Sequence, residues 1–232
     1  MIEVIRSEDR GSADHGWLQS RHTFSFADYQ NPARVNFGPL RVVNEDWIAA
    51  GKGFDTHPHR DMEIITYMLD GELEHKDNMG NGSVIRPGEL QRMTAGTGVL
   101  HSEFNASADT PAHLLQIWLF PEENDLQPGY EQEFFAPELK QNQWCLVGSR
   151  DGRDGSLTIH QDVNLYASSL QESHAIDIEL LAGRNSFLHI ARGKVTMNDE
   201  ELVAGDAVTV EGQASLKVHA SEDSEMLLFD MT

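Results

Sequence analysis

The sequence has little that would anchor the protein outside the cell or cross-link its chain. Its 232 residues include a single cysteine, Cys145, which cannot form an intramolecular disulfide. The N-terminal sequence MIEVIRSEDRGSADHG lacks a charged segment followed by an apolar run, as a secretory signal would require. No apolar stretch approaches the roughly 18 residues of a membrane span. These absences predict a soluble cytoplasmic protein that does not act in a membrane.

Basic residues are also scarce, with 17 Lys and Arg against 38 Asp and Glu and a formal charge of -21. Such a charge repels phosphate backbones and anionic lipid at long range, and no run of Lys and Arg offsets it. Direct binding of nucleic acid is therefore not expected, whereas a protein partner remains open. The acidity itself is interpreted as a means of staying soluble.

Long amphipathic helices are a further absence. Gly and Pro recur in short clusters such as GKG, MGNGS, RPGE and TAGTG, which punctuate short runs rich in β-branched and aromatic residues. Those runs are EIITYML, HLLQIWLF, SFLHIA, KVTM, AVTV and EMLLFDM. Short strands separated by turn residues predict an all-β sandwich or barrel.

The two halves of the chain resemble each other. YMLDGELEH, IRPGELQRMTAG and VLHSEFNASADTPAHLLQIWLF follow one another in the first half, and LHIARGKVTMND, LVAGDAVTVEG and KVHASEDSEMLLFDM in the second. The shared order of strands and Gly turns predicts two related β-barrels in tandem. We expect one barrel over residues 1–125, with the remainder, 126–232, holding a polar connector and the second barrel.

A pair of histidines in the first half has the spacing of metal ligands. His57 and His59 are separated only by Pro58, and residues i and i+2 of a strand point to the same face. Two imidazoles on one extended segment can reach one ion, whereas on a helix they would diverge. The pair alone is weak support, because such spacing also occurs on surface turns.

A second pair, His101 and Glu103, repeats the spacing on what should be a neighbouring strand. Three imidazoles and one carboxylate suit a divalent ion such as Fe, Mn, Co, Ni, Cu or Zn, whereas Ca or Mg would take more oxygen ligands. An octahedral ion with four protein ligands keeps two positions open, as a catalytic site requires. The two pairs together predict one catalytic metal centre in the first barrel.

These residues lie in patterns that resemble the two cupin motifs. The first motif is matched in order by Gly51, His57, His59, Glu63 and Gly71, with one extra residue before the last glycine. The second ends in a histidine and an asparagine four positions later, which His101 and Asn105 match, while Gly96 stands where proline is usual. Both motifs occur in the expected order.

The wider pattern resembles the pirin family of bicupins, and more particularly its bacterial members with quercetin dioxygenase-like activity. The segments that carry this resemblance are DHGWLQSRHTFSFADYQNP, THPHRDMEIITYMLDGELEHKDNMGN, RMTAGTGVLHSEFN, LQIWLFPEEN and DGRDGSLTIHQDVNLY. The resemblance implies two jelly-roll cupin barrels and four metal ligands: His57, His59, His101 and Glu103. In many cupins the first-motif glutamate is a ligand, so Glu63 competes with Glu103; we expect Glu63 to stand behind the site.

The resemblance also implies an activity. We expect a dioxygenase that opens a flavonol ring with O₂ at a centre holding Fe²⁺, although Zn, Mn, Ni, Co and Cu remain open. Glu103, if it swings off the ion, could take the proton of the substrate hydroxyl as general base. The alternative is a metal-containing regulator that binds a protein, such as a transcription factor, with flavonol turnover incidental.

The remaining histidines give weaker indications. The second barrel has Glu179 and Leu181 where the first has its histidine pair, and only His219 corresponds to His101, so no metal is expected there. His75, Asp77 and Asn78 are interpreted as a solvated hairpin turn. His15 and His22 are expected in capping or strand pairing rather than in a pocket. His113 could face the metal cavity or pack in its strand.

Overall fold

The computed structural model describes residues 1–180 and 182–232, so the expectation for Leu181 lies outside the described residues. Strands dominate this part of the chain, and the all-β prediction is confirmed. Within residues 1–180 and 182–232, helical structure is limited to α1 (Pro137–Lys140) and two 3₁₀ turns, Ser7–Asp9 and Arg153–Gly155. None of the described helices has the length and hydropathy to cross a membrane.

The chain forms two compact units, each of which is built from separate segments of the sequence. The N-terminal unit comprises Gly11–Phe134 and Leu157–Gln161, and the C-terminal unit comprises Met1–Arg10, Phe135–Ser156 and Asp162–Thr232. The boundary expected after residue 125 stays a prediction: the main segment of the N-terminal unit ends at Phe134, and Met1–Arg10 belong to the C-terminal unit.

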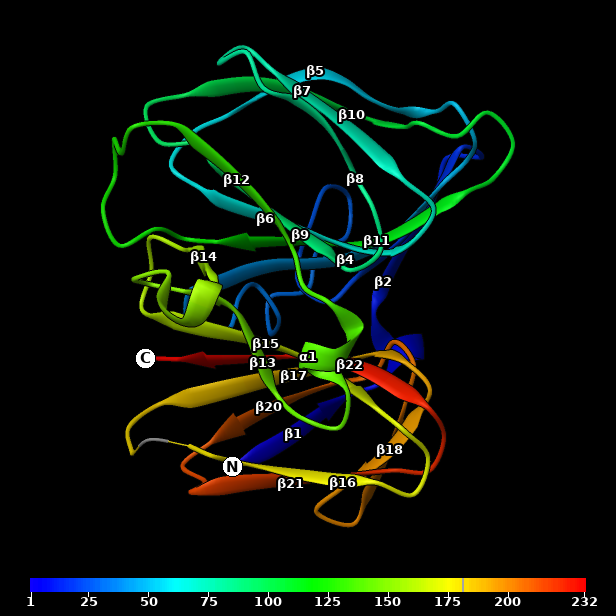
Figure 1. The fold of residues 1–232 in the computed structure, drawn as a ribbon, viewed down its shortest axis with the longest axis vertical. Helices are drawn as coiled ribbons and strands as arrows, with labels where there is room; N and C mark the ends of the chain where they lie inside the picture. Colours follow the sequence, from blue (N-terminus) through cyan, green and yellow to red (C-terminus); the bar gives the residue numbers. More distant parts are fainter. Residues whose placement is uncertain (181) are drawn as a thin grey trace. The chain divides into compact units, whose positions relative to one another are not determined.

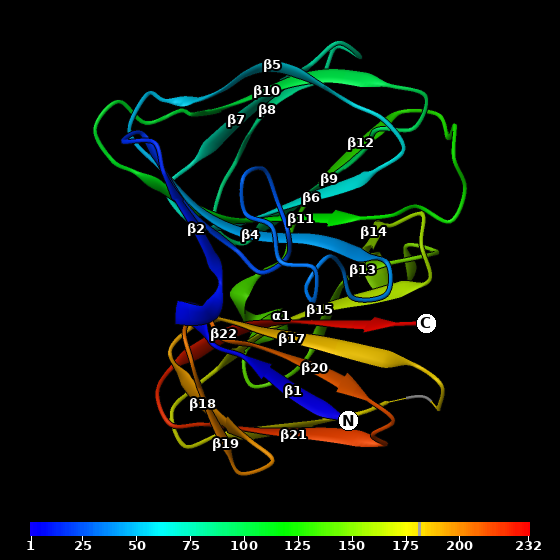
Figure 2. The ribbon, with the colours of Figure 1, turned by 180° about the vertical axis from the view of Figure 1, so that it is seen from behind.

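The N-terminal unit contains two antiparallel sheets of jelly-roll type (Figures 1 and 2). The smaller sheet has the order β5-β10-β7-β8, and the larger has the order β12-β9-β6-β11-β4-β3-β2. The strands of this unit are β2 (Gly11–Asp14), β3 (Leu18–His22), β4 (Leu40–Ile48), β5 (Gly53–His59), β6 (Glu63–Asp70), β7 (Leu73–Asp77), β8 (Gly82–Ile85), β9 (Glu89–Thr94), β10 (Val99–Asn105), β11 (Ala112–Leu119), β12 (Gly129–Phe134) and β14 (Leu157–Thr158).

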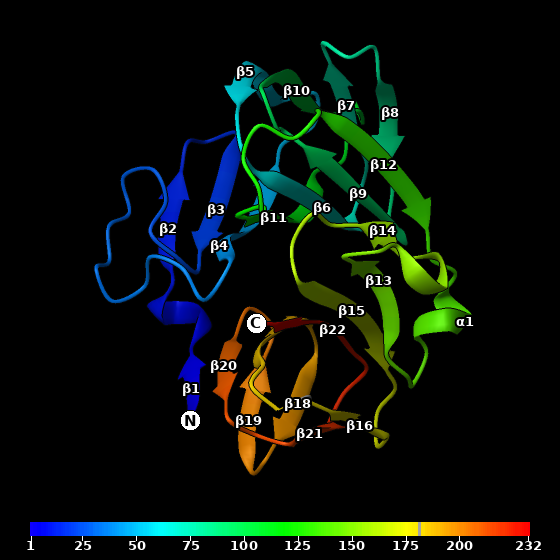
Figure 3. The ribbon, with the colours of Figure 1, turned by 90° about the vertical axis from the view of Figure 1, so that its left-hand side faces the viewer.

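The C-terminal unit repeats this topology. Its smaller sheet, β16-β21-β18-β19, matches β5-β10-β7-β8 strand for strand (Figure 3), and β20-β17-β22-β15 in its larger sheet matches β9-β6-β11-β4. The internal repeat expected from the sequence is therefore a repeat of topology. The strands of this unit are β1 (Ile2–Ile5), β13 (Cys145–Ser149), β15 (Val163–Leu170), β16 (Ala175–Glu179), β17 (Asn185–Arg192), β18 (Lys194–Met197), β19 (Glu200–Val203), β20 (Ala207–Glu211), β21 (Ser215–Ala220) and β22 (Ser224–Met231).

Apolar side chains from both sheets of the N-terminal unit meet in one cluster. Leu73 of β7 and Ile85 of β8 contribute from the smaller sheet, while Ile48, Met68 and Leu114 contribute from the larger one. Each is at most 1 % exposed, and burying such a side chain stabilises the fold by about 1.5–3 kcal/mol. This core fixes the smaller sheet, and with it β5 and β10, against the larger one.

Candidate metal centre and its pocket

The two predicted ligand pairs lie on neighbouring strands. His57 and His59 belong to β5, and His101 and Glu103 belong to β10, which pairs with β5 so that His101 is the cross-strand partner of His57. One side-chain nitrogen from each of the three histidines lies within 4.8 Å of the other two. The structure therefore brings together the three imidazoles that the sequence singled out.

The protonation of these rings fits a metal centre. The Nδ1–H of His57 donates to the backbone carbonyl of Asp55 at 2.8 Å, so Nε2 is the ring nitrogen that this bond does not use. Burial, together with the neighbouring imidazoles, lowers the pKa of His59 to about 4 and that of His101 to about 3. Nε2 of His101 is buried and has no hydrogen-bond partner. Neutral imidazoles with unused nitrogens are the form that binds divalent transition metals.

Glu103 lies beside this cluster but is held by a different group. Glu103 is 3 % exposed, and its carboxylate accepts hydrogen bonds from Nε2 of Gln116 at 3.0 and 3.1 Å. The β5–β10 register shifts between His101 and Glu103. Gly53 permits the close approach of the strands here, because a Cβ at this position would lie 2.1 Å from the carbonyl oxygen of Glu103. Glu103 thus lies beside the three histidines, but its carboxylate is not within 4.8 Å of all three ligand nitrogens.

Glu63 makes its contacts elsewhere. This fully buried carboxylate accepts hydrogen bonds from the backbone N–H of His160 and from its Nδ1, both at 3.1 Å. The guanidinium of Arg92 is 4.0 Å away and also binds Thr94, whose hydroxyl contacts the His160 ring. Glu63 therefore ties the start of β6 to the segment around His160.

The solvated turn expected at His75 and Asp77 is wrong for both side chains, each of which is 0 % exposed. They lie on β7, whose inward positions alternate from Leu73, while Glu74 and Lys76 face outward. Nε2 of His75 is 3.2 Å from Oδ2 of Asp77, and Nδ1 of His75 is 3.5 Å from Nδ1 of His101. The alternation in step with Leu73 was the sequence signal for their burial.

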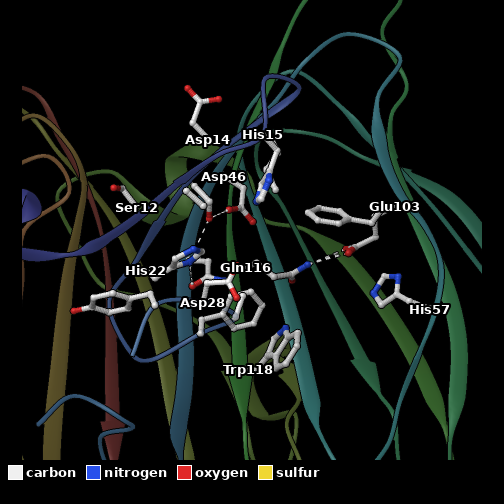
Figure 4. A pocket seen from close by; sticks show the side chains of 18 of the residues that line it. Ser12, Asp14, His15, His22, Asp28, Asp46, His57, Glu103, Gln116 and Trp118 are labelled. Atoms are coloured by element: carbon white, nitrogen blue, oxygen red, sulfur yellow. Dashed lines mark hydrogen bonds between the residues drawn. The ribbon is translucent and has the colours of Figure 1, made fainter. Parts of the chain in front are cut away.

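A pocket of about 690 Å³ opens from the centre and is lined by His57, His59 and Glu103. Figure 4 shows Gln116 reaching toward Glu103, with His22 and Asp46 on the opposite side of the pocket. Aromatic side chains form much of its wall: Phe26, Tyr29, Phe54 and Trp118. The volume and the apolar wall suit a small planar ligand.

Two further histidines line this pocket. His15 and His22 are both among its lining residues, although the sequence favoured capping or strand pairing for them. His22 is on β3, where its Nδ1 is 2.9 Å from the side-chain oxygen of Asn44 and its ring stacks 6.5 Å from that of Tyr29. Sequence reasoning also missed Gln116 and Trp118, which alternation places on one face of β11.

Other candidate histidines lie apart from the cluster. His113 stacks on Trp47 with ring centroids 4.4 Å apart, and its Nε2 is 2.9 Å from a carboxylate oxygen of Glu45. This contact settles the open choice in favour of packing along the strand. In the C-terminal unit, His219 is exposed on β21.

Comparison with known proteins accounts for both units. Residues 4–119 match the family model Pirin, and residues 146–231 match the model of the quercetinase C-terminal cupin domain. The chain is 47% identical over 232 residues to quercetin 2,3-dioxygenase of Escherichia coli K12, covering 100% of this chain and 99% of that protein.

Solved structures agree with this result. The bacterial pirin YhhW from Escherichia coli, in complex with nickel(II), superposes with a TM-score of 0.95 at 46% identity and covers 100% of this chain and 99% of its own. A quercetin 2,3-dioxygenase from Acinetobacter baumannii, at 20% identity and a TM-score of 0.78 over 99% of this chain and 85% of its own, shares the fold. The chain belongs to the pirin family.

Proposed function

We propose that this protein is a metal-dependent dioxygenase of the quercetin 2,3-dioxygenase type, which opens the ring of a flavonol with O₂. The observation that carries the proposal is the convergence of three imidazoles beside an aromatic-walled pocket. The 47% identity to the Escherichia coli protein named quercetin 2,3-dioxygenase supplies the substrate class.

The residues that would hold the ion are His57, His59 and His101, with Glu103 as the fourth ligand. The bound ion would supply Lewis-acid activation of a substrate hydroxyl and a redox-capable centre. We propose Fe²⁺ as the native ion. The nickel(II) in the YhhW complex supports a site for a first-row divalent ion, because imidazole and carboxylate ligands accept several such ions.

The chain's own residues would bind and orient the flavonol. Trp118, whose ring lies 4.9 Å from that of His59, and Phe26, 5.4 Å from Trp118, form a wall for a flat aromatic ring. Such a wall holds the substrate in one plane and keeps water from the reacting carbon atoms. The planar shape of a flavonol is the reason that we prefer it to a flexible enol.

Glu103 would accept the proton of the substrate hydroxyl. A general base must lie within hydrogen-bond reach of that proton, and Glu103 lines the same pocket as His57 and His59. Gln116 donates to both carboxylate oxygens and so fixes the plane of the carboxylate before substrate arrives. The proton would pass from the hydroxyl oxygen to one Oε of Glu103.

Replacement of His59 by Ala tests this function. Metal content by elemental analysis and O₂ uptake with quercetin should both be lost, whereas the His219→Ala variant, which removes the corresponding exposed histidine of the C-terminal unit, should keep both. Quercetin turnover by metal-free His59→Ala protein would contradict the proposal. Metal binding without turnover of any flavonol would instead favour a protein-binding regulator.

A further inference from the structure

Three buried groups form a line behind the histidine cluster. Nδ1 of His101 faces Nδ1 of His75 at 3.5 Å, and Nε2 of His75 faces Oδ2 of Asp77 at 3.2 Å. His101 is 2 % exposed, and the side chains of His75 and Asp77 are fully buried. The three residues lie on the paired strands β7 and β10, so the backbone ladder fixes their spacing.

Asp77 forms the acceptor end of this line. Its Oδ1 accepts the backbone N–H groups of Met79 and Asn81 at 2.9 and 3.0 Å, and its Oδ2 accepts the side-chain amide of Asn81 at 2.8 Å. Burial acts to raise the pKa of Asp77, but hydrogen bonds from Asn81, His75 and Met79 outweigh burial and lower it. A carboxylate held by donors on both oxygens can only accept from His75.

The positions of the protons then follow along the line. Since Asp77 accepts, Nε2 of His75 donates to it, and an imidazole that carries a single proton has its lone pair on the other nitrogen, Nδ1. A proton on Nδ1 of His101 would then point at this lone pair, 3.5 Å away. Nε2 of His101, which has no hydrogen-bond partner, is left with its lone pair.

The ring of His75 is also fixed from its other side. Tyr130 packs against it with ring centroids 4.9 Å apart, and the Tyr130 hydroxyl binds Ser83 and donates to Gln132 at 2.6 Å. A tyrosine held at both its ring and its hydroxyl leaves His75 little freedom to rotate. The ring of His75 therefore keeps its Nδ1 directed at Nδ1 of His101.

We propose that His75 and Asp77 are positioning residues that hold His101 in the tautomer with a bare Nε2, the one able to bind the metal. This inference rests on the metal centre of the proposed function. Carboxylates and other acceptors behind a ligating histidine typically contribute 10–100-fold to metal affinity. Here the acceptor would be a second histidine that is itself oriented by a carboxylate.

The first test is the tautomer of His101 in metal-free protein, which needs neither metal nor substrate. Long-range ¹H–¹⁵N NMR spectra of histidine-labelled protein should show His101 protonated on Nδ1 and bare on Nε2, and His75 protonated on Nε2. In the His75→Phe variant the acceptor is gone, so His101 should populate both tautomers. Wild-type protein with His101 protonated on Nε2 would overturn the inference.

The second test is the affinity for Ni²⁺, measured by competition with a chelator. His75→Phe should weaken binding about 10–100-fold, Asp77→Asn should weaken it less, and His75→Gln should recover part of the loss because the glutamine oxygen can accept from His101. The matched control is His113→Phe, which removes a different histidine paired with a carboxylate. Affinities of His75→Phe and Asp77→Asn equal to the wild type would contradict the proposal.

The two proposals can fail separately. If His57→Ala binds Ni²⁺ as tightly as the wild type, the metal centre itself is wrong, whatever the tautomer of His101. If His57→Ala loses the metal while His75→Phe and Asp77→Asn keep it, only the positioning role is wrong. Should His75→Phe not fold, the wild-type tautomer and the Asp77→Asn affinity still decide the question.

Discussion

The hydrogen bonds from Gln116 to Glu103 allow a quantitative prediction. Nε2 of Gln116 reaches both carboxylate oxygens, at 3.0 and 3.1 Å, and Oε1 of Gln116 accepts from the hydroxyl of Thr66 at 3.2 Å. Gln116 is 8 % exposed and Glu103 is 3 % exposed, so the carboxylate depends on this donor. Gln116→Leu keeps the approximate volume and removes the donor.

The expected cost is that of one hydrogen bond to a charged group, about 1.5–3 kcal/mol in the free energy of unfolding, plus about 0.5–1.5 kcal/mol for the bond from Thr66, which also loses its acceptor in this variant. The two distances count as one bond because a single nitrogen is shared between the oxygens. Urea denaturation of metal-free protein measures the change. Thr66→Val, which removes only the outer hydrogen bond between neutral groups, is the control and should cost about 0.5–1.5 kcal/mol. Equal stability of Gln116→Leu and wild type would show that the hydrogen bonds of Gln116 do not stabilise the fold.

Three further predictions concern other parts of the chain. Glu63→Gln should leave Ni²⁺ affinity within about twofold of the wild type, whereas Glu103→Gln should weaken it by at least about tenfold, as chelator competition would show; the reverse order would make Glu63 the ligand. Gly96→Ala should destabilise the protein by about 1–3 kcal/mol in thermal unfolding, because φ is +45° and a Cβ would lie 1.9 Å from the carbonyl oxygen of Leu126; an unchanged melting temperature would count against this turn. Phe187 is fully buried in the C-terminal unit, so Phe187→Ala should lower the free energy of unfolding by about 3–5 kcal/mol in urea denaturation. Its Ni²⁺ affinity should equal that of the wild type, and a loss of Ni²⁺ binding would contradict the placement of the metal ligands in the N-terminal unit alone.

The three histidines of the centre could be predicted because strand geometry is local. Alternation places His57 and His59 on one face, and a second pair at the same spacing supplies His101 from a neighbouring strand. The order of strands and turns likewise predicted the all-β fold and its repeat. Each pair and each strand follows from residues close together in the sequence, whereas the repeat follows from comparing the two halves of the chain.

Other features depend on pairing over long distances and could not be predicted. The residues of β1 (Ile2–Ile5) do not indicate that this strand pairs with β20. The polar connector likewise does not indicate that it contains β12, which pairs with β9. The alternation of His75 and Asp77 with Leu73 places the three on one face of a strand, but that this face is buried depends on the pairing of β7 with β10. The role of Gln116 could not be predicted, because it donates to Glu103, which lies on a strand of the other sheet.

The fate of the two oxygen atoms of O₂ distinguishes a dioxygenase from every other reading of the metal centre. Metal-loaded wild-type protein should be incubated with quercetin under ¹⁸O₂, and the ring-opened product should be analysed by mass spectrometry. Our account predicts two ¹⁸O atoms in the product, with no product from chelator-stripped protein and recovery when the ion is restored. A product with one or no ¹⁸O atom, or equal turnover by the stripped protein, would contradict the assignment as a metal-dependent dioxygenase.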